Sequence, residues 1–200
     1  MNTAEALNQA LFLAINGSAE TPHGVVDLAL VCAKYLAVLV PLLLAALWLT
    51  GRAWPRELAV RACLVALLAL LANFVIGLAW PHPRPFVIGL GHQFLPHAPT
   101  PSFPSSHVAA FAAVAVTLLA GRLWRWGALV TVAGLAVAWA RVFVGVHFPL
   151  DMLGAVVVAC LAYALIAPFW WSRGSALTDA LAVLYRRWCA LPIRLGWLRP

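Results

Sequence analysis

The stretch Met152–Trp171, MLGAVVVACLAYALIAPFWW, contains twenty apolar residues without an interruption. About 20 apolar residues are enough to cross the hydrocarbon core of a bilayer, so this stretch predicts a transmembrane helix. The composition of the whole chain agrees, because 64% of its 200 residues are hydrophobic and only 10% are charged. A water-soluble fold could not cover its surface with so few polar side chains, and the sequence therefore predicts a membrane protein.

Four further segments have the composition of membrane spans. They are residues 28–49, 62–81, 104–120 and 126–140, of which the last two are shorter. Residues 6–15 and 176–190 are too short or too charged to span, and we expect each to form a short amphipathic helix at the membrane surface. The expected fold class is all-α, a polytopic membrane helical bundle with about five transmembrane helices and short amphipathic helices at both ends. It forms one domain over residues 1–200.

Most of the basic residues lie on one side of this expected bundle. Five spans place these arginines in the loops of a single side: Arg52, Arg56, Arg61, Arg122, Arg125, Arg173, Arg186, Arg187, Arg194 and Arg199. Loops rich in arginine stay in the cytoplasm, so this side, with the C-terminal tail, is expected to be cytoplasmic. The net charge of +7 then reflects topology and contact with anionic membrane lipids, and we expect no nucleic-acid partner.

The opposite side carries the residues that can do chemistry. All six histidines map there, namely His23, His82, His92, His97, His107 and His147. Arg84 and Arg141 also map there, against the positive-inside pattern, and an anionic ligand bound on that side would explain them. We expect no catalytic role for His23, His82, His92 and His97, because none has a partner at a suitable spacing.

Three short segments bring polar side chains to that side. They are PHPRPF (Pro81–Phe86), PSSH (Pro104–His107) and ARVFVGVHFPLD (Ala140–Asp151). The guanidinium groups of Arg84 and Arg141 can hold phosphate oxygens and stabilise the charge that develops during phosphoryl transfer. Ser105 and Ser106 offer hydroxyl groups at a helix start, where free N–H groups form an anion site. The pattern therefore predicts a phosphate-binding pocket.

The pair His147 and Asp151 supplies a nucleophile for that pocket. Pro149 favours a helix start here, so the Asp151 carboxylate can hold one imidazole nitrogen of His147 and leave the other free to attack phosphorus. His107 can act as the general acid that protonates the leaving oxygen. We expect a phosphohistidine mechanism with His147, Asp151 and His107 as catalytic residues, and neither a metal nor a cofactor.

Taken in order, RP (Arg84–Pro85), PSSH (Pro104–His107) and R-x5-H-x3-D (Arg141, His147, Asp151) resemble the motifs of the type 2 phosphatidic acid phosphatase superfamily. The five-span plan is similar to its bacterial undecaprenyl pyrophosphate phosphatases of the bacitracin-resistance type. The resemblance implies a nucleophile at His147, an orienting carboxylate at Asp151 and an acid at His107. It implies phosphate binding by a set of four residues: Arg84, Ser105, Ser106 and Arg141.

The same resemblance implies a biological setting. It implies hydrolysis of undecaprenyl pyrophosphate to undecaprenyl phosphate, which recycles the carrier lipid for cell-wall biogenesis. The expected location is the bacterial inner membrane, with the active site facing the periplasm.

The sequence departs from the family pattern at three positions. The first motif of the family usually has a lysine where this chain has Gly77, and a serine usually stands where this chain has Ala140. Ser106 replaces a residue that is often glycine. Lys34 lies inside an expected span, where an ionisable group usually has a function, and is the candidate accessory cation in place of the missing lysine.

Three alternatives stay open at this point. The substrate could be another lipid phosphate with a glycerol base, such as phosphatidylglycerol phosphate, phosphatidate or diacylglycerol pyrophosphate. A protein of another class, a membrane b-type haem protein, would use His107 and His147 as axial ligands. A transporter would need internal repeats and more polar residues at mid-membrane than this sequence has. The oligomeric state is not determined by the sequence.

Overall fold

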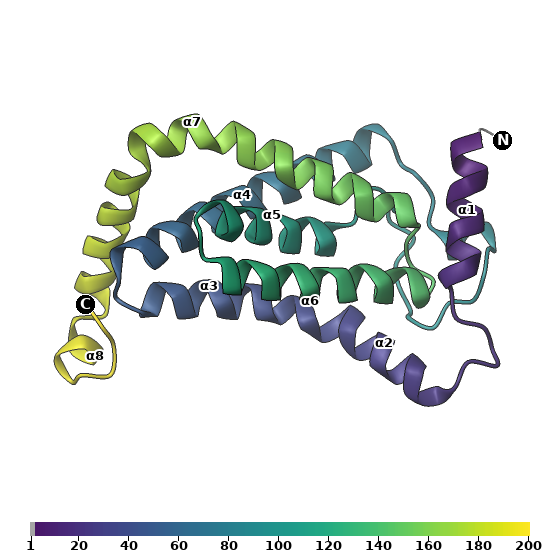
Figure 1. The fold of residues 1–200 in the computed structure, drawn as a ribbon, viewed down its shortest axis with the longest axis horizontal. Helices are drawn as coiled ribbons and strands as arrows, with labels where there is room; N and C mark the ends of the chain where they lie inside the picture. Colours follow the sequence, from purple (N-terminus) through teal and green to yellow (C-terminus); the bar gives the residue numbers. More distant parts are fainter. Residues whose placement is uncertain (1–2) are drawn as a thin grey trace.

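The computed structural model describes residues 3–200, and within that range it is helical and has no strand. The elements, in chain order, are α1 (Thr3–Ile15), α2 (His23–Tyr35), η1 (Leu36–Val38), α3 (Leu39–Leu49), α4 (Ala53–Ala79), η2 (Pro85–Ile88), α5 (Ser106–Ala120), α6 (Trp124–Phe143), α7 (Pro149–Trp188) and α8 (Ala190–Arg194). The long helices run side by side along the long axis of the molecule (Figure 1). The predicted all-α membrane helical bundle is confirmed.

Within residues 3–200, four helical segments are long and apolar enough to cross a membrane. They are His23–Leu49, Ala53–Ala79, Trp124–Phe143 and Pro149–Trp188. The remaining expected span corresponds to α5, which is apolar but has only 15 residues. It packs against α4, α6 and α7, so it forms the centre of the bundle. The bundle therefore has four long spans around one short central helix.

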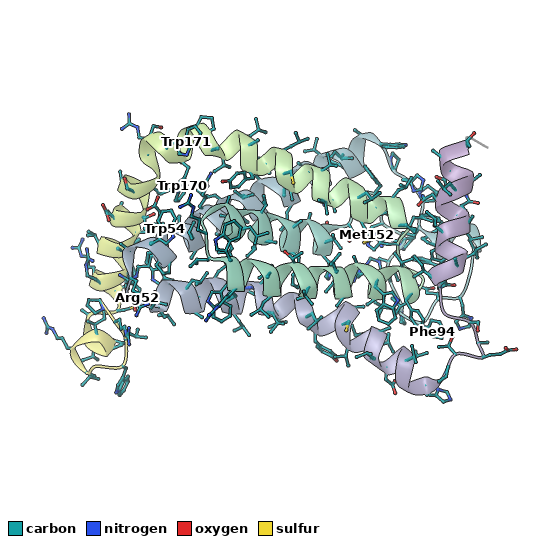
Figure 2. All side chains as sticks on the ribbon, in the orientation of Figure 1. Arg52, Trp54, Phe94, Met152, Trp170 and Trp171 are labelled. Carbon is teal, nitrogen blue, oxygen red and sulfur yellow. The ribbon has the colours of Figure 1, made fainter. Side chains whose placement is uncertain are left out.

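Prolines interrupt the regular course of two spans. Pro41 lacks an N–H group and its ring crowds the carbonyl one turn earlier, which accounts for the 3-10 turn Leu36–Val38 between α2 and α3. Pro168 lies inside α7, and the helix changes direction close to Trp170 and Trp171 (Figures 1 and 2). The missing hydrogen bond at Pro168 explains this bend.

The C-terminal tail differs from the prediction. We expected a separate amphipathic helix over residues 176–190, but α7 continues without interruption to Trp188. Helical hydrogen bonding tolerates a proline when the helix bends, so residues 176–188 follow the span within the same helix, after the change of direction. The short helix α8 follows. At the other terminus, the expected helix over residues 6–15 is present as α1.

Different elements lie at the two ends of the bundle. At one end, here named the site end, α1 crosses the bundle beside the long loop (residues 80–105) and the His147 loop (residues 144–148) (Figure 1). The opposite end, here named the far end, holds α8 and the C-terminus. Arg52, Trp54, Trp170 and Trp171 also lie toward the far end (Figure 2). These four residues therefore lie at the end opposite the histidine-rich loops.

Candidate active site

His147 and Asp151 meet at the junction of the His147 loop and α7. Pro149 is the first residue of α7, where its fixed φ angle suits a helix start and its missing N–H costs nothing. The Asp151 carboxylate oxygen Oδ2 accepts a hydrogen bond from the Phe148 backbone N–H at 2.8 Å and lies 3.0 Å from Nδ1 of His147. Both side chains are buried, so Asp151 holds the imidazole in one orientation.

Arg84 joins the long loop to the His147 loop. Its Nη1 atom donates to the Val146 carbonyl at 2.8 Å and lies 3.1 Å from Nε2 of His147. Its other nitrogens donate to the carbonyl and hydroxyl of Thr100 and to the carbonyl of Pro101. A guanidinium can only donate, so Nε2 of His147 must be the unprotonated ring nitrogen and Nδ1 must carry the proton.

Arg141 approaches the same nitrogen from the last turn of α6. Its Nη2 atom lies 3.5 Å from Nε2 of His147, and its Nη1 donates to the Ala33 carbonyl at 3.4 Å. The Arg141 side chain is buried, and its Nε has no hydrogen-bond partner among the described residues. Two guanidinium groups therefore converge on the one histidine nitrogen that is free to act as a nucleophile.

Burial determines the charge of the groups in the loops. It lowers the pKa of His147 to about 4, although the hydrogen bond and the charge of Asp151 raise it. It also lowers the pKa of Arg84 to about 10, against the attraction of Asp151. At neutral pH the imidazole is therefore neutral and nucleophilic, while the guanidinium beside it keeps its positive charge.

A cavity of about 410 Å³ brings the separate motifs together. Arg84, Arg141 and His147 line it, together with Ser106 and His107 from the first turn of α5. The rest of its wall is largely apolar and comes from α4 and the long loop: Leu70, Phe74, Leu78, Pro101, Phe103 and Pro104. The cavity thus combines anion-binding groups with an apolar wall, as a phosphate bearing a lipid chain requires.

Ser105 lies behind this cavity and does not line it. It is the N-cap of α5, yet its side chain makes no capping hydrogen bond, and its buried Oγ has no partner among the described residues. Its backbone N–H donates to the carbonyl of Asp151 at 3.2 Å. The serine therefore ties the start of α5 to the start of α7, and the first N–H groups of α5 have no side-chain cap from it.

Within the described chain, no lysine replaces the missing lysine of the first motif in this pocket, as the positions of Lys34 and Gly77 show. Lys34 lies on the exposed side of α2 and is not among the residues that line the pocket. Gly77 does line it and contributes no side chain. The structure therefore brings the predicted phosphate-binding arginines together but does not bring Lys34 to them.

The model of the PAP2 superfamily matches residues 58–175, more than half of the chain. This chain belongs to the PAP2 superfamily. The Escherichia coli (strain K12) protein YbjG, provisionally named an undecaprenyl-diphosphatase, is 39% identical over 199 residues, covering 98% of each chain. Undecaprenyl-diphosphatase BcrC of Bacillus subtilis (strain 168) is 32% identical over 155 residues, covering 78% of this chain and 80% of BcrC.

Solved structures have the same fold. The crystal structure of Aquifex aeolicus LpxE matches with a TM-score of 0.62 and 26% identity, covering 80% of this chain and 93% of LpxE. A PAP2 type phosphatidylglycerolphosphate phosphatase from Bacillus subtilis matches with a TM-score of 0.62 and 21% identity, covering 84% and 87% of the two chains. Together with the family match, these relatives identify the chain as a membrane lipid phosphatase of the PAP2 superfamily.

The PAP2 site includes three residues that were not predicted. Ser102 is fully buried and its Oγ donates to Oδ2 of Asp151. Thr100 accepts from Arg84, and His97 lines the pocket although we expected no role for it. The position of Ser102, two residues before the PSSH motif, could have indicated that it belongs to the site. The positions of Thr100 and His97 in the loop give no such indication.

The other three histidines lie outside the PAP2 pocket. His23 is the exposed first residue of α2, and His92 is exposed in the long loop. The ring of His82 lies 3.5 Å from a carboxylate oxygen of Glu5 and packs against Phe148. Residues 3–200 hold no group of three or more His, Cys, Asp or Glu side chains placed to bind a metal ion.

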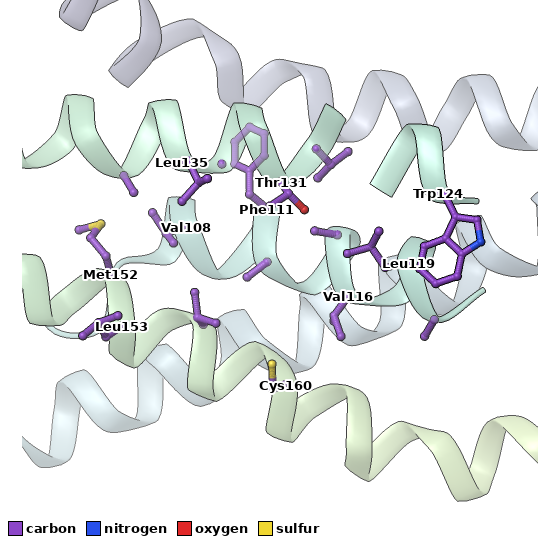
Figure 3. A pocket seen from close by; sticks show the side chains of 17 residues that line it. Val108, Phe111, Val116, Leu119, Trp124, Thr131, Leu135, Met152, Leu153 and Cys160 are labelled. Atoms are coloured by element: carbon purple, nitrogen blue, oxygen red, sulfur yellow. The ribbon is translucent and has the colours of Figure 1, made fainter. Parts of the chain in front are cut away.

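A second cavity, of about 510 Å³, is lined by none of these residues (Figure 3). It is a groove between α5, α6 and α7, and its wall is almost wholly apolar, including Val108, Phe111, Leu119, Trp124, Leu153 and Cys160. No arginine, histidine or carboxylate lines it. The smaller cavity at the site end is therefore the one of these two that is lined by arginine and histidine side chains.

Proposed function

We propose that this enzyme hydrolyses undecaprenyl pyrophosphate to undecaprenyl phosphate and inorganic phosphate. The convergence of Arg84 and Arg141 on Nε2 of His147 carries the proposal, because a phosphoryl group bonded to that atom would meet both cations. The undecaprenyl-diphosphatase names of YbjG and BcrC support a polyprenyl diphosphate as the substrate.

The first half of the proposed reaction transfers the terminal phosphoryl group to the enzyme. Nε2 of His147 forms a bond to the terminal phosphorus while the bond from that phosphorus to the bridging oxygen breaks. The electron pair leaves with undecaprenyl phosphate, and His107 donates a proton to the departing oxygen. Asp151 stabilises the positive charge that develops on the imidazole through its contact with Nδ1.

The second half restores the enzyme. A water oxygen forms a bond to phosphorus, the bond from phosphorus to Nε2 breaks, and His107 takes the proton of the water. While Nε2 carries the phosphoryl group, the guanidiniums of Arg84 and Arg141 bind the phosphoryl oxygens instead of Nε2. Ser106 and the first N–H groups of α5 supply further donors beside them.

The proposed orientation places the site end at the outer face of the bacterial inner membrane and the C-terminus in the cytoplasm. Arginine-rich loops at the far end support this orientation, since such loops remain cytoplasmic. A lipid whose chain stays in the bilayer could then present its diphosphate to the cavity beside the apolar wall of α4.

Two kinds of alternative are less well supported. Other PAP2 substrates, namely phosphatidylglycerol phosphate, phosphatidate and diacylglycerol pyrophosphate, fit the same cations but not the names of YbjG and BcrC. A haem bound by His147 would place iron at a nitrogen that already faces two guanidinium groups. The purified protein should therefore show no Soret band.

A lipid panel tests the proposal. Phosphate release is measured in detergent for the wild type, His147→Ala and His107→Ala on undecaprenyl pyrophosphate and on the three alternative lipids, with and without EDTA. We expect the highest kcat/KM on undecaprenyl pyrophosphate, a loss of at least about 1000-fold in both variants, and little effect of EDTA. A preference for another lipid would replace the substrate, whereas full activity of His147→Ala would remove the mechanism.

A phosphorylated enzyme is the direct sign of the proposed intermediate. With substrate labelled in its terminal phosphate, an alkaline quench should leave label on the wild-type protein, because a phosphohistidine survives alkali. His147→Ala should carry none, while the matched variant His23→Ala, at an exposed residue outside the pocket, should label normally. Label that persists in His147→Ala would place the phosphoryl group on another residue.

A further inference from the structure

The charge of the pocket is small for the substrate proposed above. Among the described residues that line it, the permanently charged side chains are Arg84 and Arg141. A lipid monophosphate carries about two negative charges at neutral pH, and a lipid diphosphate carries roughly three. Lys34 lies elsewhere, and the proton of His107 passes to the departing oxygen in the proposed reaction, so the lipid-linked phosphoryl group has no cation of its own unless another group in the pocket becomes positive.

His97 is placed to become that group. It comes from the long loop, is half-buried and lines the pocket with both arginines. Its Nδ1 lies 2.9 Å from the Ala98 carbonyl oxygen, an atom that can only accept, so Nδ1 carries a proton. The other ring nitrogen, Nε2, has no hydrogen-bond partner among the described residues and is free to take up a second proton.

Burial and the two arginines favour the neutral form of His97. Burial lowers the pKa of His97, and the charges of Arg84 and Arg141 lower it further, against the hydrogen bond to Ala98. The remaining titratable groups of the pocket are His107 and His147, with Asp151 behind His147. A bound diphosphate would neutralise both arginines and add negative charge beside the ring, so protonation becomes favourable when the substrate enters.

We propose that His97 is a specificity-determining residue that binds the lipid-linked phosphoryl group of a diphosphate and so favours lipid diphosphates over lipid monophosphates. The terminal phosphoryl group occupies the two guanidiniums beside His147, which leaves the lipid-linked group to His97. This inference rests on the proposed function, and it concerns binding rather than the chemical step.

Gly77 offers an independent way to supply the same charge. It lines the pocket from α4, and a Cβ atom built there would lie 3.4 Å from the Cβ of Pro101, an ordinary van der Waals contact. A lysine at this position would add a permanent cation to the pocket from an element other than the long loop. Gly77→Lys should therefore compensate for loss of the His97 charge, whereas Gly77→Ala should not.

The test uses two lipids that share their acyl chains and differ by one phosphoryl group, diacylglycerol pyrophosphate and phosphatidate, together with undecaprenyl pyrophosphate. KM and kcat are measured for the wild type and His97→Gln, and phosphatidate is also assayed as a competitive inhibitor. In His97→Gln we expect the KM for each diphosphate, divided by the KM or Ki for phosphatidate, to be about tenfold higher than in the wild type. The kcat of His97→Gln on diphosphates should stay within about twofold of the wild type. His92→Gln, at an exposed histidine of the same loop outside the pocket, is the matched control.

The double variant His97→Gln/Gly77→Lys should restore the diphosphate KM to within about threefold of the wild type, and His97→Gln/Gly77→Ala should not. An equal rise for both lipid classes, an unchanged ratio, or a loss confined to kcat would overturn the role of His97. If the wild type hydrolyses lipid diphosphates and His97→Gln keeps the ratio, only this inference fails. If the wild type hydrolyses no lipid diphosphate, the proposed function fails with it.

Discussion

The Nη1 atom of Arg84 lies 3.1 Å from Nε2 of His147, so a permanent hydrogen-bond donor faces the nitrogen that the mechanism needs as a nucleophile. This contact fixes the tautomer, because the other ring nitrogen then holds the proton that Asp151 accepts. It also means that Arg84 and Arg141 already lie around the position that the proposed mechanism gives to a phosphoryl group. In the proposed mechanism a bound phosphate takes over this donor, while Asp151 still holds the ring.

The protonation of His147 is the first prediction. Because burial lowers its pKa to about 4 from the ordinary 6.5, the imidazole should stay neutral until the pH falls through about 4. The folded state then binds fewer protons than the unfolded state between pH 6.5 and 4, so stability should be complete above 6.5 and decrease across this range. Ring 15N shifts of histidine-labelled protein in detergent measure the midpoint, with His147→Gln for assignment. A midpoint at 6.5 or above contradicts the burial argument.

Replacing Arg84 by lysine should inactivate the enzyme although the charge is kept. The guanidinium binds the long loop, the His147 loop and His147 itself, and a single ammonium cannot reproduce these contacts. We expect kcat/KM to fall by at least about 100-fold in Arg84→Lys, as for the loss of one transition-state donor. Arg52→Lys, an exposed change at the far end, serves as the control and should stay within about twofold. Near-normal activity of Arg84→Lys would show that charge alone suffices.

Ser102 should act through Asp151. Its hydroxyl is one of the donors to Oδ2 of Asp151, together with the Phe148 N–H and Nδ1 of His147. Removing it in Ser102→Ala should lower kcat about tenfold and leave KM unchanged, because the lost hydrogen bond positions the nucleophile and touches no substrate. The exposed Ser18→Ala should change neither constant. A rise in KM without a change in kcat would instead assign Ser102 to substrate binding.

Gly145 should be required for the shape of the His147 loop. Its φ angle is +82°, and a Cβ atom added there would collide with the backbone carbonyl of His92 in the long loop. Gly145→Ala should therefore lower both the thermal unfolding temperature in detergent and the activity. Gly89→Ala makes the matched comparison, because Gly89 also has a positive φ of +69° but has open space around it. Equal losses in the two variants would mean that backbone strain, and not the contact with His92, sets the requirement.

The sequence was sufficient to predict the long apolar helices and the contacts between residues that are close together in the chain. Apolar length predicted the long spans, and the spacing of four residues predicted that Asp151 could reach His147 across a helix start. Helix rotation was not predictable in the same way. Lys34 lies in an apolar span, but its direction depends on how α2 packs, and it faces outward.

Most of the site residues that the sequence did not predict lie in the long loop. His97, Thr100 and Ser102 reach the site because Arg84 and Asp151 bind the long loop, and such contacts leave no periodic pattern in the chain. The tail was misjudged for a related reason. Pro168 is a signal for a helix end as much as for a bend, and only the packing of α7 decides between the two.

The side-chain oxygen of Asn8 in α1 accepts a hydrogen bond from the Leu150 N–H in the first turn of α7, at 3.0 Å and 142 positions along the chain. During translation, the donor of this bond is made long after its acceptor, so this contact forms only once the start of α7 has been made, whereas the Gly17 N–H can already donate to the Phe143 carbonyl when α6 is complete. Ribosome-bound fragments that stop before α7 therefore lack Asp151 and this contact of the first helix. The site around His147 is therefore complete only after the start of α7 has been made.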